Sequence, residues 1–248
     1  MEHGRRPRRP AGRRRRAGSV SAPPRSSFTP AERRLIGCVR TPADAQRWLN
    51  ALPYNTEPPP GRALLRSFRG VVRAHTAHCL EAALACAVIL EQHGYPPLVM
   101  SLESVDGLDH VVFVYRERGR WGSVAKSRDP GLHGRRPVFP SLRRLAESYF
   151  EGFIDRTGCL RAYGVVDLRV LGTYDWRLAP GNIWKVERLL FDIPHRPIRS
   201  SKSRVARLRA RYLAAIAAEP DRKPMYYDER HWTEIPGHFR APSPSPAD

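Results

Sequence analysis

A cysteine, a histidine and an aspartate follow one another in the order of a thiol acyl-transfer site. Cys79 lies where an apolar helix is predicted to begin, His110 opens a strand-like apolar run, and Asp129 follows the next strand-like run. A thiolate attacks an amide or ester carbonyl, an imidazole carries the proton, and a polar third group orients the imidazole. The sequence therefore predicts Cys79 as nucleophile, His110 as general base and acid, and Asp129 as the orienting residue.

The helix that carries Cys79 has the composition of a buried central helix. It runs from Ala77 to His93, is rich in Ala and Leu without Gly or Pro, and meets a stop signal at Gly94. A helix N-terminus and a nearby histidine lower the pKa of a thiol, and the N–H groups of the first turn can face an oxyanion. This chemistry requires no metal, and we expect neither a metal nor another cofactor.

The segments around the cysteine and the histidine resemble the transglutaminase-like cysteine enzyme superfamily. The segments that carry the resemblance are 77–83, 109–115 and 121–127, and the likeness extends over about residues 63–153. It implies a bacterial protein of that fold, with Cys79 as nucleophile, His110 as base and an amide of a protein or peptide as substrate. Cross-linking acyltransferases, peptidases, amidases and non-catalytic relatives share this superfamily, so the resemblance indicates chemistry rather than a particular substrate.

The third position departs from the superfamily pattern. Its acidic or amide residue is expected on or just after the strand that follows the histidine, close to the place of Arg128. Asp129 stands one residue late, and Ser127 would be a weaker substitute. Asp129 before Pro130 is also an ordinary turn residue. Activity depends on one of these groups reaching His110.

Two other interpretations of the same residues stay open. Cys79 can be an ordinary buried thiol, which is how we interpret Cys86 on the same helix. Alternatively, His75 and His78 share one helical face and, with Cys79 and His110, form a donor set that suits zinc. The chain has no recognised zinc motif and no dedicated carboxylate there, which disfavours the metal site. His78 would otherwise raise the positive potential beside the thiol.

The expected elements form an α+β domain of transglutaminase-like type, in which a central buried helix packs on an antiparallel sheet between disordered termini. Besides the buried helix, we predict strands at 97–102, 110–116, 120–127 and 164–170, helices that start at 29 and 41 and a helix over 140–153, a helix or a strand at 63–73 with helix favoured, a mixed edge segment at 176–191, and a basic amphipathic helix at 203–218. The strands follow one another without alternating helices, which favours an antiparallel sheet. The expected divisions are a disordered tail at 1–28, the domain at 29–198, the basic helix at 199–219 and an irregular tail at 220–248.

The charge of the chain suggests a second kind of function. The formal net charge is +19, and residues 1–27 contribute nine arginines against one glutamate. Such a balance favours an anionic partner, namely nucleic acid, an anionic membrane surface or an acidic protein. The alternative function is therefore a catalytically inactive scaffold of the same fold that binds such a partner through its basic segments. For the basic helix itself, packing by one face is the favoured interpretation.

The cysteines and the apolar runs indicate the compartment. The four cysteines show neither a C-x-x-C pair nor the spacing of a disulfide framework, and a reducing environment fits them best. No apolar run reaches the length of a membrane span, and the arginine-rich start is not followed by the apolar segment of a secretory signal. We therefore expect a cytoplasmic protein. The sequence predicts no oligomeric state.

Overall fold

The structure is a computed structural model that describes residues 21–56 and 64–219. Its helices are α1 (Pro30–Cys38), α2 (Pro42–Ala51), α3 (Phe68–Ala74), α4 (Cys79–Glu91), α5 (Leu142–Glu147), α6 (Trp184–Asp192) and α7 (Lys202–Ala218). Its strands are β1 (Leu98–Ser104), β2 (His110–Glu117), β3 (Arg120–Val124), β4 (Arg135–Phe139), β5 (Leu160–Asp167) and β6 (Arg196–Pro197). The tails predicted at 1–28 and 220–248 lie outside the described residues, apart from 21–28.

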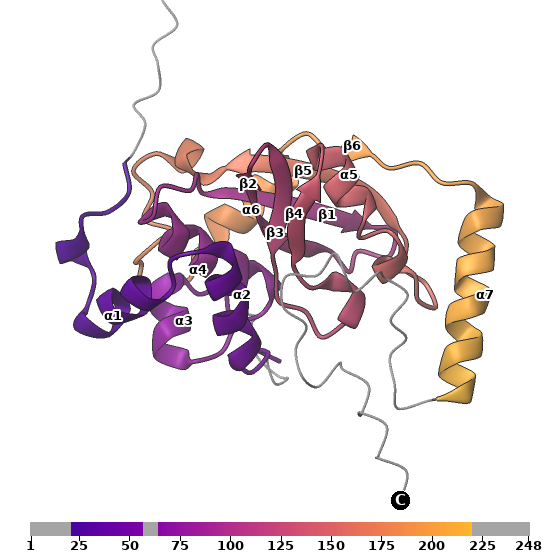
Figure 1. Cartoon of the computed structure of the whole chain (residues 1–248), viewed down its shortest axis with the longest axis horizontal. Coiled ribbons are helices and arrows are strands. Elements are labelled where there is room, and N and C mark those ends of the chain that lie inside the picture. The colour runs from indigo at the N-terminus through magenta and orange to yellow at the C-terminus, as the bar shows by residue number, and fades with distance from the viewer. Residues whose placement is uncertain (1–20, 57–63, 220–248) are drawn as a thin grey trace, which may run out of the picture.

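The strands form one antiparallel sheet, which confirms the α+β class (Figure 1). The order is β4-β3-β2-β1-β5-β6, so the three consecutive strands predicted after the buried helix lie side by side. Residue pairs such as Val99–Phe113 join β1 to β2, and pairs such as Val99–Val166 join β1 to β5. The helices α1 to α4 gather on one side of the sheet, as Figure 1 shows.

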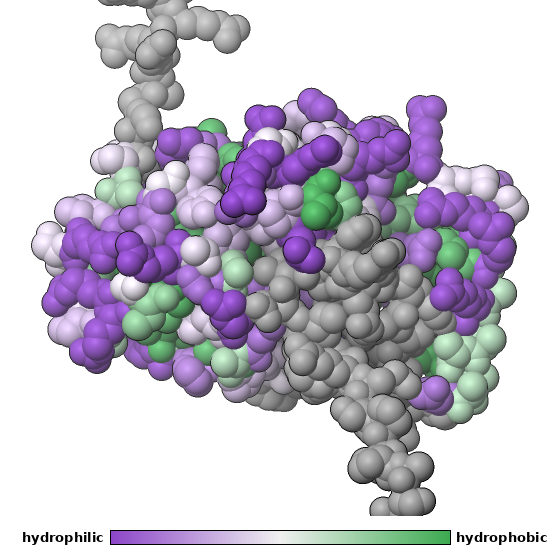
Figure 2. Space-filling view, in the orientation of Figure 1, coloured by the Kyte–Doolittle hydropathy of each residue, from purple (hydrophilic) through white to green (hydrophobic). Residues whose placement is uncertain are grey.

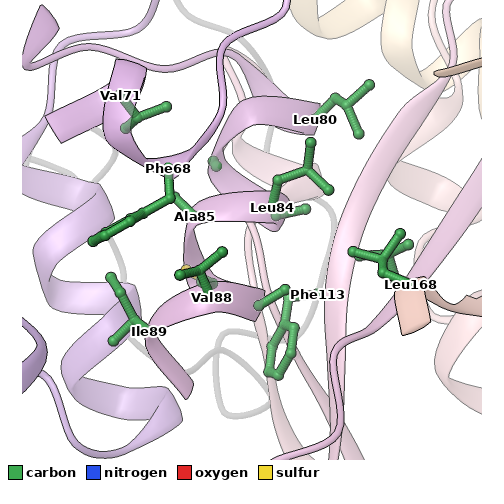
Figure 3. Packing of buried hydrophobic residues seen from close by; sticks show 14 of the residues in the cluster. Phe68, Val71, Leu80, Leu84, Ala85, Val88, Ile89, Phe113 and Leu168 are labelled. Carbon is green, nitrogen blue, oxygen red and sulfur yellow. The ribbon is translucent and has the colours of Figure 1, made fainter. Parts of the chain in front are cut away.

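Helix α4 is the buried central helix that the sequence predicted. Every residue from 80 to 90 is buried, and in Figure 3 Leu84 and Val88 lie between Phe68 of α3 and Leu168. A helix that is apolar all round must be enclosed on all sides. Burial of each large apolar side chain contributes about 1.5–3 kcal/mol, so this helix is a main source of the stability of the domain.

The opposite face of the sheet is covered as well. Side chains alternate along a strand, so Val111 and Phe113 of β2 face α4 whereas Val112 and Val114 face the other way. On that second face they join a separate apolar cluster that includes Tyr149, next to α5. Both faces of β2 are therefore buried, which explains its continuous apolar run.

Strand β3 ends earlier than the sequence predicted, because α2 takes over its continuation. We expected a strand over 120–127, and pairing stops at Val124. Beyond it, the side chain of Gln46 donates to the carbonyl of Ala125 at 2.7 Å and accepts from its N–H at 3.0 Å. The ammonium of Lys126 donates to two carbonyls at the end of α2 at 2.8 and 2.5 Å. These long-range bonds leave no signature in the strand itself.

The prediction for 176–191 was wrong. Instead of a mixed edge segment, most of its second half is helix α6, in which Val186 and Leu190 lie one turn apart and are buried. This spacing of four residues is that of an amphipathic helix. Strand β4 was not predicted either, since its five residues include charges and a proline.

Helix α7 confirms the basic helix expected at 203–218. Leu208 is buried against the second cluster, and the guanidinium of Arg209 donates to the carbonyls of Asp155 and Gly158 at 3.0 and 2.9 Å. The helix therefore packs by one face, at one end of the molecule in Figure 1.

Hydrophilic side chains dominate the face of the molecule in Figure 2. In residues 21–56 and 64–219, no helix has both the length and the apolar character that a bilayer crossing requires.

Candidate active site

Cys79 is the first residue of α4, and the residue as a whole is partly exposed. The first N–H groups of a helix have no partners within the helix and carry a partial positive charge. The thiol therefore stands at the electropositive end of the most buried helix of the domain, on a residue that keeps some exposed surface.

The start of α4 is held by neighbouring segments. Tyr54 and Ala77 form an isolated parallel bridge just before the helix. The carboxylate of Glu81, which is fully buried, accepts from the main-chain N–H of His78 at 3.1 Å and from that of Arg66 at 2.9 Å. The Arg66 guanidinium lies 3.2 Å from the same carboxylate. Glu81 thus ties the residue before Cys79 to the chain that precedes α3.

Two histidines make the thiol of Cys79 acidic. Burial by itself would raise its pKa, but hydrogen bonds from His110 and His78, together with their charges, lower the pKa from 9.0 to about 5. Burial likewise lowers the pKa of His78, and its bond to Cys79 and the charge of Glu81 outweigh that effect and raise it. A thiol with a pKa near 5 is largely thiolate at neutral pH, which is the nucleophilic form.

The ring of His110 has a defined tautomer. His110 is the first residue of β2 and is buried, and its Nε2 lies 2.8 Å from the main-chain carbonyl oxygen of Leu132. Because a carbonyl oxygen only accepts, Nε2 must carry a hydrogen and donate it. The other ring nitrogen, Nδ1, is then the one left to exchange a proton with Cys79.

His110 lies at the end of β2, beyond the part of that strand that pairs with β3. By alternation His110 lies on the sheet face that points away from α4. The ladder between β2 and β3 runs from Glu117–Arg120 to Phe113–Val124 and stops short of His110. At this end of the sheet the ring of His110 interacts with the thiol at the start of α4.

Asp129 was expected to accept from His110. The ring nitrogen Nε2 donates instead to Leu132, three residues further along the same loop. Asp129 lies where its charge acts on Tyr54, and its own N–H donates to the hydroxyl of Ser127 at 3.0 Å. An orienting role for Asp129 stays a prediction. The sequence missed Leu132 because a main-chain acceptor has no residue type by which to recognise it.

Tyr54 contributes a group that the sequence did not indicate. Its phenol oxygen accepts from the main-chain N–H of Cys79, and its ring lies 5.4 Å from the guanidinium carbon of Arg128. Burial and the nearby Cys79 charge raise the pKa of Tyr54 to about 12, although Arg128 and the Cys79 N–H act in the opposite direction. The phenol is therefore neutral, and its oxygen occupies the position where a carbonyl oxygen of a substrate would meet that N–H.

The zinc alternative gains no support. His75, one of its four residues, is exposed and caps the end of α3 in a left-handed conformation with φ of 53°. Within the described ranges, no three side chains of His, Cys, Asp or Glu form a group that could hold a metal ion.

Comparisons with known proteins give a weak link at the level of the fold. No protein-family model and no curated protein matches the chain. A structure of Legionella pneumophila LapG aligns with 61% of this chain and 90% of its own at 13% identity, with a TM-score of 0.35. The calcium-bound form of LapG aligns with 66% and 94% at 14% identity, with a TM-score of 0.36. Similarity this low carries no argument about function, which has to come from the site.

Proposed function

We propose that this protein is a cysteine-dependent acyl-transfer enzyme of transglutaminase-like type that acts on an amide of a protein or peptide. Cys79 is its nucleophile and His110 its acid and base. The observation that supports this most strongly is the environment of Cys79: a thiol at a helix N-terminus, on a partly exposed residue, whose pKa two histidines lower to about 5. A thiol with a structural role alone is inert and needs no such environment.

The reaction follows the usual course of thiol catalysis. The thiolate sulfur of Cys79 attacks the amide carbon, a C–S bond forms, and the carbonyl electron pair moves onto oxygen. The tetrahedral intermediate collapses, the C–N bond breaks, and the imidazolium of His110 gives its proton to the departing amine. Water or an amine then attacks the thioester carbon and passes its proton to His110. The C–S bond breaks, which releases the acyl product and restores the thiolate.

The oxyanion of this intermediate needs a donor, and the main-chain N–H of Cys79 has the right position at the helix start. The phenol oxygen of Tyr54 accepts from that N–H in the free protein. A substrate oxygen therefore takes the place of Tyr54 as acceptor. The displaced phenol, still protonated, can then donate its own hydrogen to the oxyanion.

A small activated ester tests the proposal without knowledge of the natural substrate. On incubation with p-nitrophenyl acetate near neutral pH, we expect an acetyl thioester on Cys79, detected by peptide mass spectrometry. Cys79→Ser and His110→Ala should lose this adduct, whereas the matched control Cys38→Ser, which changes an exposed thiol, should retain it. Acetylation of Cys38 as readily as Cys79 would show that Cys79 has no special nucleophilicity and would refute the proposal.

The pH dependence of alkylation is a second, independent test. The iodoacetamide rate of Cys79 should rise through about pH 5 and then level off, because only the thiolate reacts. A free thiol rises through about pH 8.5. A slow Cys79 with the profile of a free thiol would favour the inactive scaffold instead.

The orienting role of Asp129 is tested in the same assay. If Asp129 supports the imidazole, Asp129→Asn should slow acetylation of Cys79 by at least about tenfold, because the ring loses the group that orients it. An unchanged rate would leave the orientation of His110 to the carbonyl of Leu132.

A further inference from the structure

The carbonyl that holds His110 belongs to a loop, and a buried arginine fixes that loop. Leu132 lies between β3 and β4, in a segment that contains a single 3₁₀ turn, Pro130–Leu132. Arg135, the first residue of β4, has no exposed surface. Its guanidinium donates to the carbonyl of His133 at 2.6 Å and to that of Gly131 at 2.5 Å. These two carbonyls flank that of Leu132 on either side.

The guanidinium is itself held in one orientation. It lies over the ring of Tyr149, with 4.1 Å between the guanidinium carbon and the ring centroid. The hydroxyl of Tyr149 donates to the carbonyl of His133 at 3.1 Å and lies 2.7 Å from the hydroxyl of Ser123. Planar stacking and a rigid donor fork make arginine suited to bridging two acceptors at fixed separation. The loop is therefore held by the Arg135 guanidinium at the carbonyls of Gly131 and His133, and by the Tyr149 hydroxyl at the carbonyl of His133.

Close backbone packing limits the loop on its other side. A Cβ atom at Gly131 would lie 2.7 Å from the Cα of Gly152. The two segments that carry these glycines are therefore in direct backbone contact. The side chain of Leu132 is buried in the apolar cluster on this face of the sheet. With both flanking carbonyls and this side chain fixed, the carbonyl of Leu132 has one direction left, and it points to Nε2 of His110 at 2.8 Å.

We propose that Arg135 is a positioning residue for His110, acting through the main-chain carbonyl of Leu132. The inference rests on the proposed function, in which His110 exchanges a proton with Cys79. In a Cys-His-Asp site, a carboxylate keeps the imidazole in the productive tautomer. Here a neutral carbonyl does so, and its direction is set by a buried cation that bonds to the two flanking carbonyls. Support of this kind, from groups behind the reacting residues, is what holds a site in its productive geometry.

The proposal is tested on the full chain through the alkylation rate of Cys79 from about pH 4.5 to about pH 8.5, the range between its lowered pKa and that of a free thiol. Arg135→Met should lower the rate at about pH 6 by about fivefold to tenfold and move the midpoint upward, because a misplaced imidazole stabilises the thiolate less. Arg135→Lys keeps the charge but cannot bridge both carbonyls, so we expect a partial rescue, with a loss of about twofold to threefold.

The matched control is Arg136→Met, which changes the next arginine on β4, an exposed one. Its Cys79 profile should equal that of the wild type. A structural role alone would lower the melting temperature of the Arg135 variants and leave the Cys79 profile in the folded protein unchanged, and that result would overturn the proposal.

A second variant covers the case in which Arg135→Met does not fold. Tyr149→Phe keeps the ring under the guanidinium and removes only the hydroxyl that bonds to His133. A Cys79 midpoint that moves upward in both Tyr149→Phe and Arg135→Lys would support the proposal, and unchanged profiles in both folded variants would overturn it.

A direct readout separates this inference from the proposed function. Recorded at alkaline pH, where the ring is neutral, the ¹⁵N NMR shifts of the His110 ring report its tautomer whether or not Cys79 is reactive. We expect the Nε2–H tautomer in the wild type and a mixture in Arg135→Lys. An unreactive Cys79 in the wild type would refute the proposed function, while the tautomer would still decide the role of Arg135: an unchanged Nε2–H tautomer in the variant refutes it.

Discussion

Two cysteines on the same helix have opposite properties. Cys79 and Cys86 lie about two turns apart on α4, and burial raises the pKa of both thiols. For Cys86, with apolar neighbours, nothing opposes this effect and its pKa stays above the ordinary value. For Cys79, the bonds and charges of His110 and His78 reverse it. Burial alone keeps a thiol protonated, whereas two imidazoles at a helix start favour the thiolate.

The surroundings of the middle and of the first turn of α4 explain the contrast. The middle of the helix is enclosed by apolar side chains of α2, α3 and the sheet. At its first turn, the buried carboxylate of Glu81 and the end of β2 bring polar groups to the helix. The helix therefore provides both a rigid apolar anchor and a polar end at which chemistry can occur.

His110→Ala should reduce the difference in thiol pKa between Cys79 and Cys86 more than any other substitution. Without the imidazole, burial acts on Cys79 much as it acts on Cys86, and the pKa of Cys79 should return toward that of a free thiol, about 8.5. At about pH 6, we expect the iodoacetamide rate of Cys79 to fall tenfold to a hundredfold. Peptide mapping after timed alkylation measures this rate, with Cys38 as the internal reference.

A control for this variant is His93→Ala, which changes a histidine whose Nε2 lies 2.7 Å from the carbonyl of Ile36 in α1, away from the thiol. Its Cys79 profile should match the wild type. If His110→Ala retained the wild-type midpoint, the contrast between the two cysteines would have another cause.

Cys79 is the more reactive of the two cysteines, but substitution of Cys86 should reduce the free energy of unfolding more. Cys86→Ser places a hydroxyl among apolar side chains, which costs about 1–2 kcal/mol, or about tenfold in the unfolding equilibrium. Cys79→Ser, at a partly exposed helix start, should cost less than about 0.5 kcal/mol. Urea unfolding followed by tryptophan fluorescence measures both. Equal losses would contradict the assignment of Cys86 to the core and Cys79 to a site.

The free energy of unfolding, measured as a function of pH under alkaline conditions, tests Cys86 separately. Its raised pKa means that the folded thiol keeps its proton above about pH 8.5, whereas the unfolded thiol releases it. The unfolded state then binds fewer protons, so the contribution of Cys86 to stability is full below about pH 8.5 and declines above it. Cys86→Ala should lack this decline.

His78→Gln should raise the pKa of Cys79 as well, but by less than His110→Ala does. The bond from His78 lowers the pKa of Cys79 less than the bond from His110 does, and the main-chain N–H of residue 78 keeps its bond to Glu81 in the variant. We expect the Cys79 rate at about pH 6 to fall about threefold to fivefold. A loss equal to that of His110→Ala would make the two histidines equivalent and would weaken the case for His110 as the catalytic base.

Much of this architecture could be predicted from the sequence because it depends on local pattern. The all-round apolar character of α4 fixes its burial, and the order of a cysteine at a helix start before a histidine on a strand identifies Cys79 and His110. The capping residue Thr29, followed by Pro30 and Glu32, likewise predicts the start of α1, where the structure has a complete capping box.

The rest depends on contacts between distant segments. The bonds from Gln46 that end β3 early link residues 79 positions apart, and nothing in the strand reveals them. The acceptor for His110 is a main-chain carbonyl, which every residue possesses, so the sequence directs attention to a nearby carboxylate, Asp129. Arg135 reads as an ordinary surface charge until the fold encloses it.

Cys159 provides the smallest and finest test of the comparison, because it has partial burial without a histidine partner. Burial raises the pKa of its thiol, and the charges of Arg209 and Arg204 from α7 offset part of that rise. We therefore expect Cys159 to react with iodoacetamide about twofold to threefold more slowly than exposed Cys38 at about pH 7.5, yet much faster than Cys86. Arg209→Met, which removes the first of these charges, should slow Cys159 further and leave Cys79 unchanged. If the loss of that charge instead affected both thiols alike, the acidity of Cys79 would stem from the positive field of the whole protein, and the two histidines would lose their special place.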